Sequence, residues 1–256
     1  EIDLLFDFLK EKKIKLNVQT VFFGGGSPTI LIKEDLKYLV DKLKGLFDWS
    51  KVVNFTVESD PRRVDEERLL YNHKVCGANR ISFGMQDFDP NVQRRVNRIQ
   101  PAELFKKILT KEVRKAYKTI AFDLLIGQPG QTPETMEKTC DQIVELQPTL
   151  VQLSLMAYKP WVAKYQIRML EEGPLPDFLE RKELLEVIHK KLKDAGYLRT
   201  GFECYSLPND PMTKAFKEGT AHYGASGHQT GGRVNFIAVG SSATSNLGDD
   251  YYSQNF

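Results

Sequence analysis

Residues 19–29 read Gln-Thr-Val-Phe-Phe-Gly-Gly-Gly-Ser-Pro-Thr, a short apolar run that ends in three glycines. The run Gln19–Phe23 has the length and composition of a buried strand in a parallel sheet. Glycines directly after such a strand let the backbone approach a ligand closely. A tight turn that needs positive φ is the alternative interpretation. No Gly-Lys-Ser/Thr follows, so this segment is not a phosphate-binding P-loop.

The same alternation of apolar runs and helical patterns continues along the chain, which is typical of βα units around a parallel sheet. The expected strands, rich in Val, Ile, Phe and Leu as strands buried on both faces are, are Gln19–Phe23, Val53–Val57, Arg80–Gly84, Thr119–Ile126 and Leu150–Met156. The expected helices are Ile2–Lys12, Lys33–Phe47, Asp65–Val75, Ala102–Ala116, Glu134–Leu146 and Phe178–Ala195. Such repeats without a dinucleotide fingerprint favour an α/β barrel-like sheet over an open Rossmann sheet.

Beyond Pro160 the βα alternation weakens. The segment Tyr197–Asn209 is expected to form a strand with its turn. The glycine-rich segment 219–232, which contains His222 and His228, is expected to be a loop. We divide the chain into a barrel core, residues 1–160, and a closing helix with the start of an extension, residues 161–256.

Polar residues follow the expected strands where each strand ends. Gly24–Ser27 follow the first strand, Glu58 the second and Gln86 the third, while Asp123 lies in the C-terminal half of the fourth and Ala157 follows the fifth. In a β/α barrel the loops after the strands form the active face. We therefore expect these positions to surround one cavity.

Each polar residue also has a plainer interpretation. Glu58 could bind an ammonium or hydroxyl group, or act as an acid or base, but it could equally be a solvated loop carboxylate. Arg98 offers a planar fork for a carboxylate, although a single arginine is usually a surface residue. Asp123 interrupts an apolar strand and needs a partner, either a structural hydrogen bond or a ligand, and we favour a ligand.

Composition excludes several classes of protein. The net charge of +2 with 27% charged residues lacks the basic stripe of a nucleic-acid-binding protein. No apolar run has the length of a membrane span, and no signal peptide opens the chain. The three cysteines, Cys76, Cys140 and Cys204, are too few and too far apart for a disulfide scaffold, which indicates a reducing cytoplasm.

The cysteines form no metal-cluster motif, because each lies 64 residues from the next and no Cys-x3-Cys-x2-Cys occurs. Cys76 and Cys140 fall on apolar helix faces, so we interpret them as core residues. The histidines have no metal-ligand spacing. His222 and His228 could contact a substrate or could simply be exposed.

Taken together, several segments resemble the radical S-adenosylmethionine (SAM) coproporphyrinogen III dehydrogenases, also called oxygen-independent coproporphyrinogen III oxidases. The resemblance covers nearly the whole chain, in order. Its segments are Val21–Thr29, Val57–Arg62, Ile81–Phe88, Val92–Gln100, Phe122–Glu134, Gly173–Pro176 and Gly248–Asn255. It implies a partial (β/α)6-type radical SAM barrel with a C-terminal extension, whose first strand is missing here.

The resemblance also implies which residues bind cofactor. Two SAM molecules bind in the family, the first at an iron–sulfur cluster. Contacts to the first are implied for Gly25, Glu58 and Ala157. Contacts to the second are implied for Gly26, Ser27, Gln86, Arg98 and Asp123. Thr244 matches a further SAM-contacting position that is usually isoleucine.

The implied reaction is radical decarboxylation in anaerobic heme synthesis. An electron from the [4Fe-4S] cluster cleaves SAM, and the resulting 5′-deoxyadenosyl radical removes a hydrogen atom from a propionate β-carbon. Loss of CO2 and one electron leaves a vinyl group, twice per coproporphyrinogen III, which gives protoporphyrinogen IX. The implied partners are this substrate and an electron donor, with no nucleic acid or membrane, for a monomeric cytoplasmic enzyme.

This chain departs from the family pattern in three respects. The cluster-binding Cys-x3-Cys-x2-Cys loop is expected before Glu1, so the chain contains no cluster ligands, and the family's C-terminal domain is expected after its end. An expected Phe-Gln pair that contacts the second SAM reads Ala225-Ser226. Two alternatives therefore stay open: a related radical SAM methyltransferase or heme-degrading enzyme, or a heme-binding or heme-delivery protein that uses His222 or His228.

Overall fold

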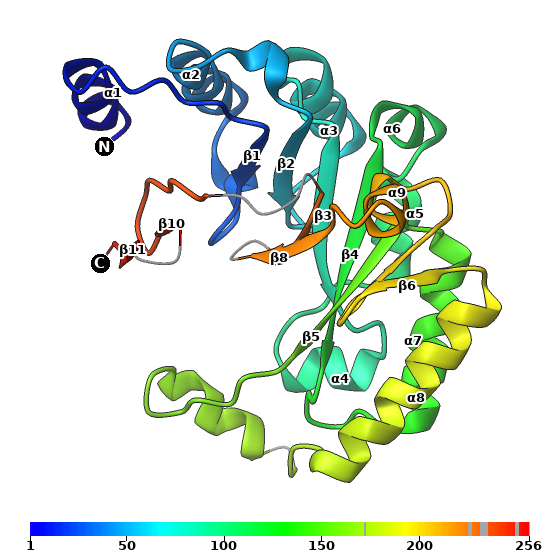
Figure 1. Ribbon diagram of the computed structural model, residues 1–256. Helices are drawn as coiled ribbons and strands as arrows, with labels where there is room; N and C mark the ends of the chain where they lie inside the picture. Colours follow the sequence, from blue (N-terminus) through cyan, green and yellow to red (C-terminus); the bar gives the residue numbers. More distant parts are fainter. Residues whose placement is uncertain (172, 225–226, 231–234, 249–250, 256) are drawn as a thin grey trace.

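A seven-stranded sheet forms the centre of the molecule (Figure 1). The computed structural model describes residues 1–171, 173–224, 227–230, 235–248 and 251–255. The sheet order is β1-β2-β3-β4-β5-β7-β6, in which β1 to β5 are parallel and β7 is antiparallel to both of its neighbours. The strands are β1 (Thr20–Phe23), β2 (Asn54–Ser59), β3 (Arg80–Gln86), β4 (Thr119–Ile126), β5 (Leu150–Leu155), β6 (Leu198–Gly201) and β7 (Cys204–Ser206).

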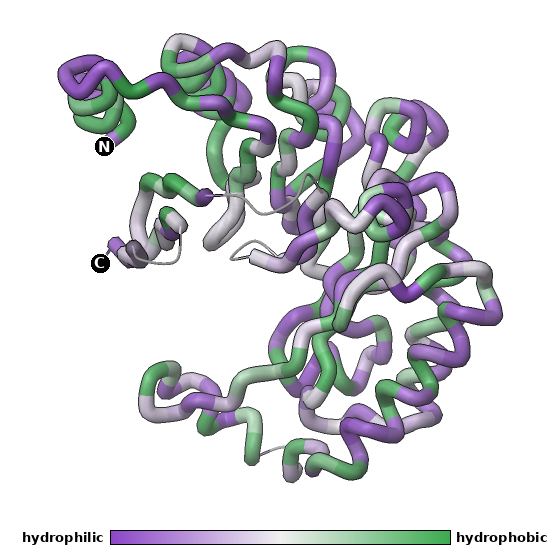
Figure 2. The backbone as a smooth tube through the Cα atoms, in the orientation of Figure 1, coloured by the Kyte–Doolittle hydropathy of each residue, from purple (hydrophilic) through white to green (hydrophobic). Residues whose placement is uncertain are grey.

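Helices cover the outer side of this curved sheet, and the inner side faces the C-terminal segments (Figure 1). Figure 2 shows that hydrophilic and hydrophobic stretches alternate along α8, on the outer side, whose Leu184, Ile188 and Leu192 are buried. The helices are α1 (Ile2–Glu11), α2 (Lys33–Lys44), α3 (Glu66–Tyr71), α4 (Pro90–Arg95), α5 (Ala102–Ile108), α6 (Lys111–Ala116), α7 (Pro133–Leu146), α8 (Phe178–Asp194) and α9 (Pro211–Lys217). Among the described residues, no helix is long and apolar enough to cross a membrane.

The two faces of the sheet differ in polarity. In β3, Ile81, Phe83 and Met85 are fully buried on the outer side, while Arg80 and Ser82 alternate with them on the inner side. Successive side chains of a strand point to opposite faces, which explains the alternation. β3 is thus buried largely on both faces, as expected, but its inner face carries polar as well as apolar residues.

The core on the outer side contains an aromatic cluster. The ring centroids of Phe105 and Phe122 lie 4.9 Å apart, and those of Phe88 and Phe105 5.3 Å apart. Phe83 packs edge-on against both Phe105 and Phe122. This cluster joins β3 and β4 to α5, so it fixes the part of the sheet on which the candidate site is built.

Two expected helices differ from those observed. The helix expected over 102–116 is two helices, α5 and α6, because Thr110 caps the second by accepting a hydrogen bond from the backbone N–H of Val113. The helix expected over 65–75 is α3 followed by a π-helical turn, Asn72–Cys76, that ends at Gly77 with φ of 91°.

The C-terminal region also differs in part from the expectation. The strand expected over 197–209 is the hairpin β6–β7, which extends the main sheet. The expected loop over 219–232 instead contains a second hairpin, β8 (His222–Gly224) and β9 (Gly227–Gln229), and residues 225–226 and 231–234 lie outside the described part. A further hairpin, β10 (Thr244–Leu247) and β11 (Tyr251–Gln254), follows. Whether 160/161 is a domain boundary stays a prediction.

We predict that Phe122→Ala lowers the free energy of unfolding by about 3–5 kcal/mol, because the cavity left in a close-packed aromatic cluster cannot collapse fully. Urea titration followed by circular dichroism measures this. Phe178→Ala is the matched control, since Phe178 is 79% exposed whereas Phe122 is fully buried. Equal losses in the two variants would contradict the assignment of the core.

Candidate functional site

The glycine loop after β1 is open on one side and crowded on the other. Gly25 has a φ of 101°, and a Cβ at Gly25 or at Gly26 would meet no atom within 4 Å. A Cβ at Gly24, by contrast, would overlap the ring of Phe22 and lie 3.0 Å from the carboxyl carbon of Glu58. Gly24 therefore makes room for the Phe22 ring and for the Glu58 side chain, while Gly25 and Gly26 leave backbone groups accessible to a ligand. Beyond them, the hydroxyl groups of Ser27 and Thr29 lie 2.8 Å apart.

Two carboxylates and a hydroxyl group form a polar group on the inner face. The backbone N–H of Gly25 donates to Glu58 Oε2 at 3.2 Å, and Ser82 Oγ donates to Asp123 Oδ2 at 2.9 Å. In the sheet register Glu58 is paired with Ser82, and Ser82 with Ala121, two residues before Asp123. The sheet thus brings together three strands that are distant in sequence.

Burial disfavours the charged form of both acids. It raises the pKa of Glu58 to about 7, a shift to which the nearby charge of Asp123 adds and which the Gly25 hydrogen bond opposes. Burial likewise raises the pKa of Asp123 to about 6, against the effect of the Ser82 hydroxyl group and the charge of Arg80. Both acids therefore favour the protonated form more than an exposed carboxyl group does, and a cationic ligand would stabilise their ionised form.

A second group of polar side chains lies at the end of β3. Arg98 donates from Nη2 to the carbonyl oxygen of Gly84 at 2.9 Å and from Nε to Gln100 Oε1 at 3.0 Å. A Cβ at Gly84 would lie 2.8 Å from Gln86 Nε2 and 3.0 Å from Arg98 Nη2, so glycine permits both side chains to converge there. Two donors of the Arg98 fork therefore bind protein groups rather than facing open space.

The remaining two predicted positions lie outside these groups. Ala157 is exposed, two residues after β5, and its carbonyl oxygen accepts from Gln166 Nε2 at 3.0 Å. Thr244 begins β10 and pairs with Gln254. Among the described residues, no hydrogen bond links either position to Glu58, Asp123 or Arg98. Ala225-Ser226 lie outside the described residues.

Ser82 and Arg80 are not among the site residues predicted from the sequence. Both belong to β3 and point to the inner face, as the alternation along the strand requires. Arg80 is 7% exposed, and its charge influences Asp123. Alternation does not extend simply to Gln86, because the pairing of β3 with β4 shifts register between Phe83 and Gln86.

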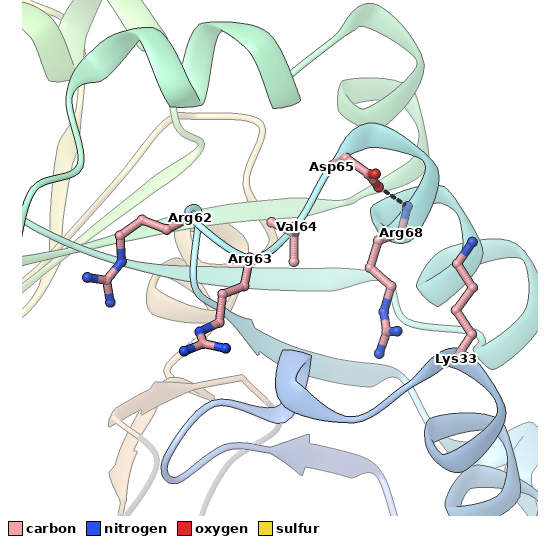
Figure 3. Close-up of a pocket in the computed structure, with 6 residues that line it drawn as sticks. All are labelled: Lys33, Arg62, Arg63, Val64, Asp65 and Arg68. Carbon is pink, nitrogen blue, oxygen red and sulfur yellow. Dashed lines mark hydrogen bonds between the residues drawn. The ribbon is translucent and has the colours of Figure 1, made fainter.

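Two hollows lie apart from the predicted site residues. One, of about 420 Å³, is lined by Lys33, Asp65 and three arginines of the β2–α3 region, Arg62, Arg63 and Arg68 (Figure 3). Acidic neighbours reduce its charge, since Asp60 binds Arg62 and Glu67 binds Lys33. The other hollow, of about 630 Å³, lies between the β6–β7 turn and β8, and includes His222 and His228. Neither contains Glu58 or Asp123, so the expectation of one enclosed cavity around the predicted residues stays a prediction.

The cysteines do not fit an iron–sulfur cluster. Cys76, Cys140 and Cys204 are all buried and unpaired, as expected for core residues. Burial raises the pKa of Cys140 to about 12 and that of Cys204 to about 11, which disfavours the thiolate that binds iron. Within the described part of the chain, no three His, Cys, Asp or Glu side chains converge to hold a metal ion.

Comparison with known proteins places the chain in a family. The radical SAM superfamily profile matches residues 1–143, more than half of the sequence. The chain belongs to the radical SAM superfamily. This family contains the observed arrangement of a mainly parallel sheet, and the crystal structure of coproporphyrinogen III oxidase (HemN) from Escherichia coli superposes with a TM-score of 0.86. That comparison has 29% identity and covers 99% of this chain and 59% of HemN.

Two of the curated proteins similar to this chain have the same name. The oxygen-independent coproporphyrinogen III oxidase of Pseudomonas aeruginosa is 33% identical over 258 residues, which cover all of this chain and 55% of that protein. The enzyme of the same name from Escherichia coli is 31% identical over 235 residues, 92% of this chain and 51% of that protein. The chain thus spans about half the length of the curated relatives that it matches.

Folding raises the pKa of Glu58 from 4.5 to about 7. Between these pH values the folded state keeps a proton that the unfolded state has released, so the free energy of unfolding falls as pH rises through this range. We predict that Glu58→Gln removes this loss. The variant should be about 1–2 kcal/mol more stable than the parent at pH 8, less than the full shift because Glu58 retains contact with water. Urea titrations at pH 5 and pH 8 test this, with the exposed Glu103→Gln as control. A parent whose stability does not fall between these pH values would refute the assignment.

Proposed function

We propose that the protein is a SAM-dependent coproporphyrinogen III oxidase that converts propionate side chains to vinyl groups, as the names of its relatives suggest. The observation that carries the proposal is the convergence of Gly25 and the paired acids Glu58 and Asp123 on the inner face of a sheet that superposes on HemN with a TM-score of 0.86. Acids whose burial is costly are suited to a ligand that carries positive charge.

SAM fits the glycine loop and the acids chemically. It carries an ammonium and a sulfonium group, both complementary to carboxylates, and the space beside Gly25 and Gly26 is free for its backbone contacts. In the proposal Glu58 binds the first SAM in its ionised form, with Gly25 and Ala157 nearby. Gly26, Ser27, Gln86, Arg98 and Asp123 bind a second SAM, and Thr244 approaches it.

When bound, SAM supplies the radical that removes hydrogen from the substrate. For each propionate, one hydrogen atom leaves the β-carbon, the bond to the carboxyl carbon breaks to release CO2, and one electron passes to an acceptor. The residues of this chain orient the ligands and exclude water, so that the radical meets only the substrate. Since the buried cysteines do not fit a cluster, we assign no step of cluster chemistry to them.

The proposal includes a monomeric cytoplasmic enzyme that receives electrons from a separate donor. Its direct test is anaerobic incubation of the full-length protein with SAM, a reductant and coproporphyrinogen III. Protoporphyrinogen IX and 5′-deoxyadenosine should form together, which chromatography measures. Cleavage of SAM without any change in the porphyrinogen would contradict the proposed substrate, and the absence of both products would contradict the proposed function.

We predict that Arg98→Lys in the full-length protein weakens ligand binding by about 2–3 kcal/mol, because lysine keeps the charge but loses the planar fork. The measurement is the affinity for SAM and for coproporphyrinogen under anaerobic conditions, with iron content as the control. If the lysine variant bound both ligands as tightly as the parent, Arg98 would serve only its bonds to Gly84 and Gln100. A parallel loss of iron would instead indicate a folding defect.

A further inference from the structure

Two arginines lie against the glycines of the loop that follows β4. A Cβ at Gly127 would lie 3.0 Å from Arg181 Nε, and one at Gly130 would lie 3.1 Å from Arg95 Nε. Arg95 also reaches a third glycine, since a Cβ at Gly173 would lie 3.2 Å from its Nη1. All three glycines have positive φ, and a side chain at any of them would crowd the neighbouring guanidinium group, so glycine lets both arginines pack closely on the loop.

Among the residues that the structure describes, neither guanidinium group has an acidic partner. Arg181 donates from Nε to the carbonyl oxygen of Pro176 at 2.9 Å, while Arg95 has no hydrogen bond or ion pair with any residue that the structure describes. Both side chains are partly buried. Arg95 belongs to α4 and Arg181 to α8, and both guanidinium groups lie against the Gly127–Gly130 loop. A guanidinium group without an acidic partner can bind an anion through paired N–H donors.

The loop against which the two arginines pack adjoins the end of β3. The loop contacts the end of β3, where Gln128 Nε2 donates to the carbonyl oxygen of Gln86 at 3.4 Å. Arg95 ends α4, three residues before Arg98. Gly127 directly follows β4, the strand that carries Asp123. The unpaired charges therefore lie at the C-terminal end of the strands, the end at which β/α proteins bind their substrates.

We infer that Arg95 and Arg181 bind two carboxylate groups of one substrate, the propionates of the tetrapyrrole. This inference rests on the proposed function, which supplies a substrate with several propionate side chains. A guanidinium group matches a carboxylate with two parallel N–H···O bonds, and fixed positions reduce the entropy lost on binding. The pair sets which propionates are anchored and so which are presented to the reacting centre; Arg95 and Arg181 are thus substrate-binding residues distinct from the SAM contacts.

The test measures binding of coproporphyrin III, the stable oxidised form of the substrate, to the full-length protein by fluorescence. Arg95→Gln and Arg181→Gln keep most of each side chain and its packing on glycine but remove the charge. We expect each variant to weaken binding about 10-fold and the double variant about 100-fold, the scale of charge-assisted hydrogen bonds. KM for coproporphyrinogen should rise with little change in kcat.

Two controls separate anchoring from packing. Arg94→Gln alters the neighbouring arginine of α4, which is exposed and bonds Asn91, and it should bind as the parent does. The tetramethyl ester of coproporphyrin III lacks the carboxylates and should bind parent and variants alike. SAM affinity and thermal stability should stay unchanged in every variant.

Each outcome decides the inference. Single and double variants that bind coproporphyrin III as tightly as the parent would overturn it and leave the proposed function standing. Equal losses for the acid and the ester would assign the arginines to packing and overturn it too. A parent that neither binds coproporphyrin III nor converts coproporphyrinogen would remove the proposed function, and with it this inference.

Discussion

Successive residues of a β-strand point to opposite faces, and this constraint lets one set of parallel strands build the core and the candidate site together. In β4 the outward residues Phe122 and Leu124 are fully buried, while Asp123 between them faces inward. The outer face then gains stability from packing against helices, which leaves the inner face free to carry polar groups whose burial is costly. The rest of the molecule depends on this separation.

Burial makes the charged forms of the two inner-face acids unfavourable. Glu58 and Asp123 are desolvated and close enough for the charge of one to raise the pKa of the other. Ser82, Gly25 and the charge of Arg80 offset only part of that cost. A ligand with positive charge would stabilise the ionised form of both acids. This favourable interaction would add to the affinity for the ligand.

Glycines at four places let a functional side chain approach the backbone. Gly24 accommodates Glu58, Gly84 accommodates Gln86 with Arg98, Gly127 accommodates Arg181, and Gly130 accommodates Arg95. A side chain at any of these positions would crowd the neighbouring polar group. These glycines therefore position the charges at the strand ends, a role that the open Gly25 and Gly26 do not share.

The sequence by itself determined the succession of strands and helices, the polar positions at the strand ends and the buried cysteines, because periodicity and strand-end composition are local properties. It also indicated Glu58 and Asp123, since an acid that ends or interrupts an apolar run needs a partner. Only the tertiary structure decided that Ser82 is that partner for Asp123, that Thr110 divides one expected helix, and that residues 219–232 contain a hairpin. It alone brought Arg95 and Arg181, 86 positions apart in the sequence, against one loop. These features depend on contacts between distant segments, and a local pattern carries no information about which distant groups the packing of the sheet will bring together.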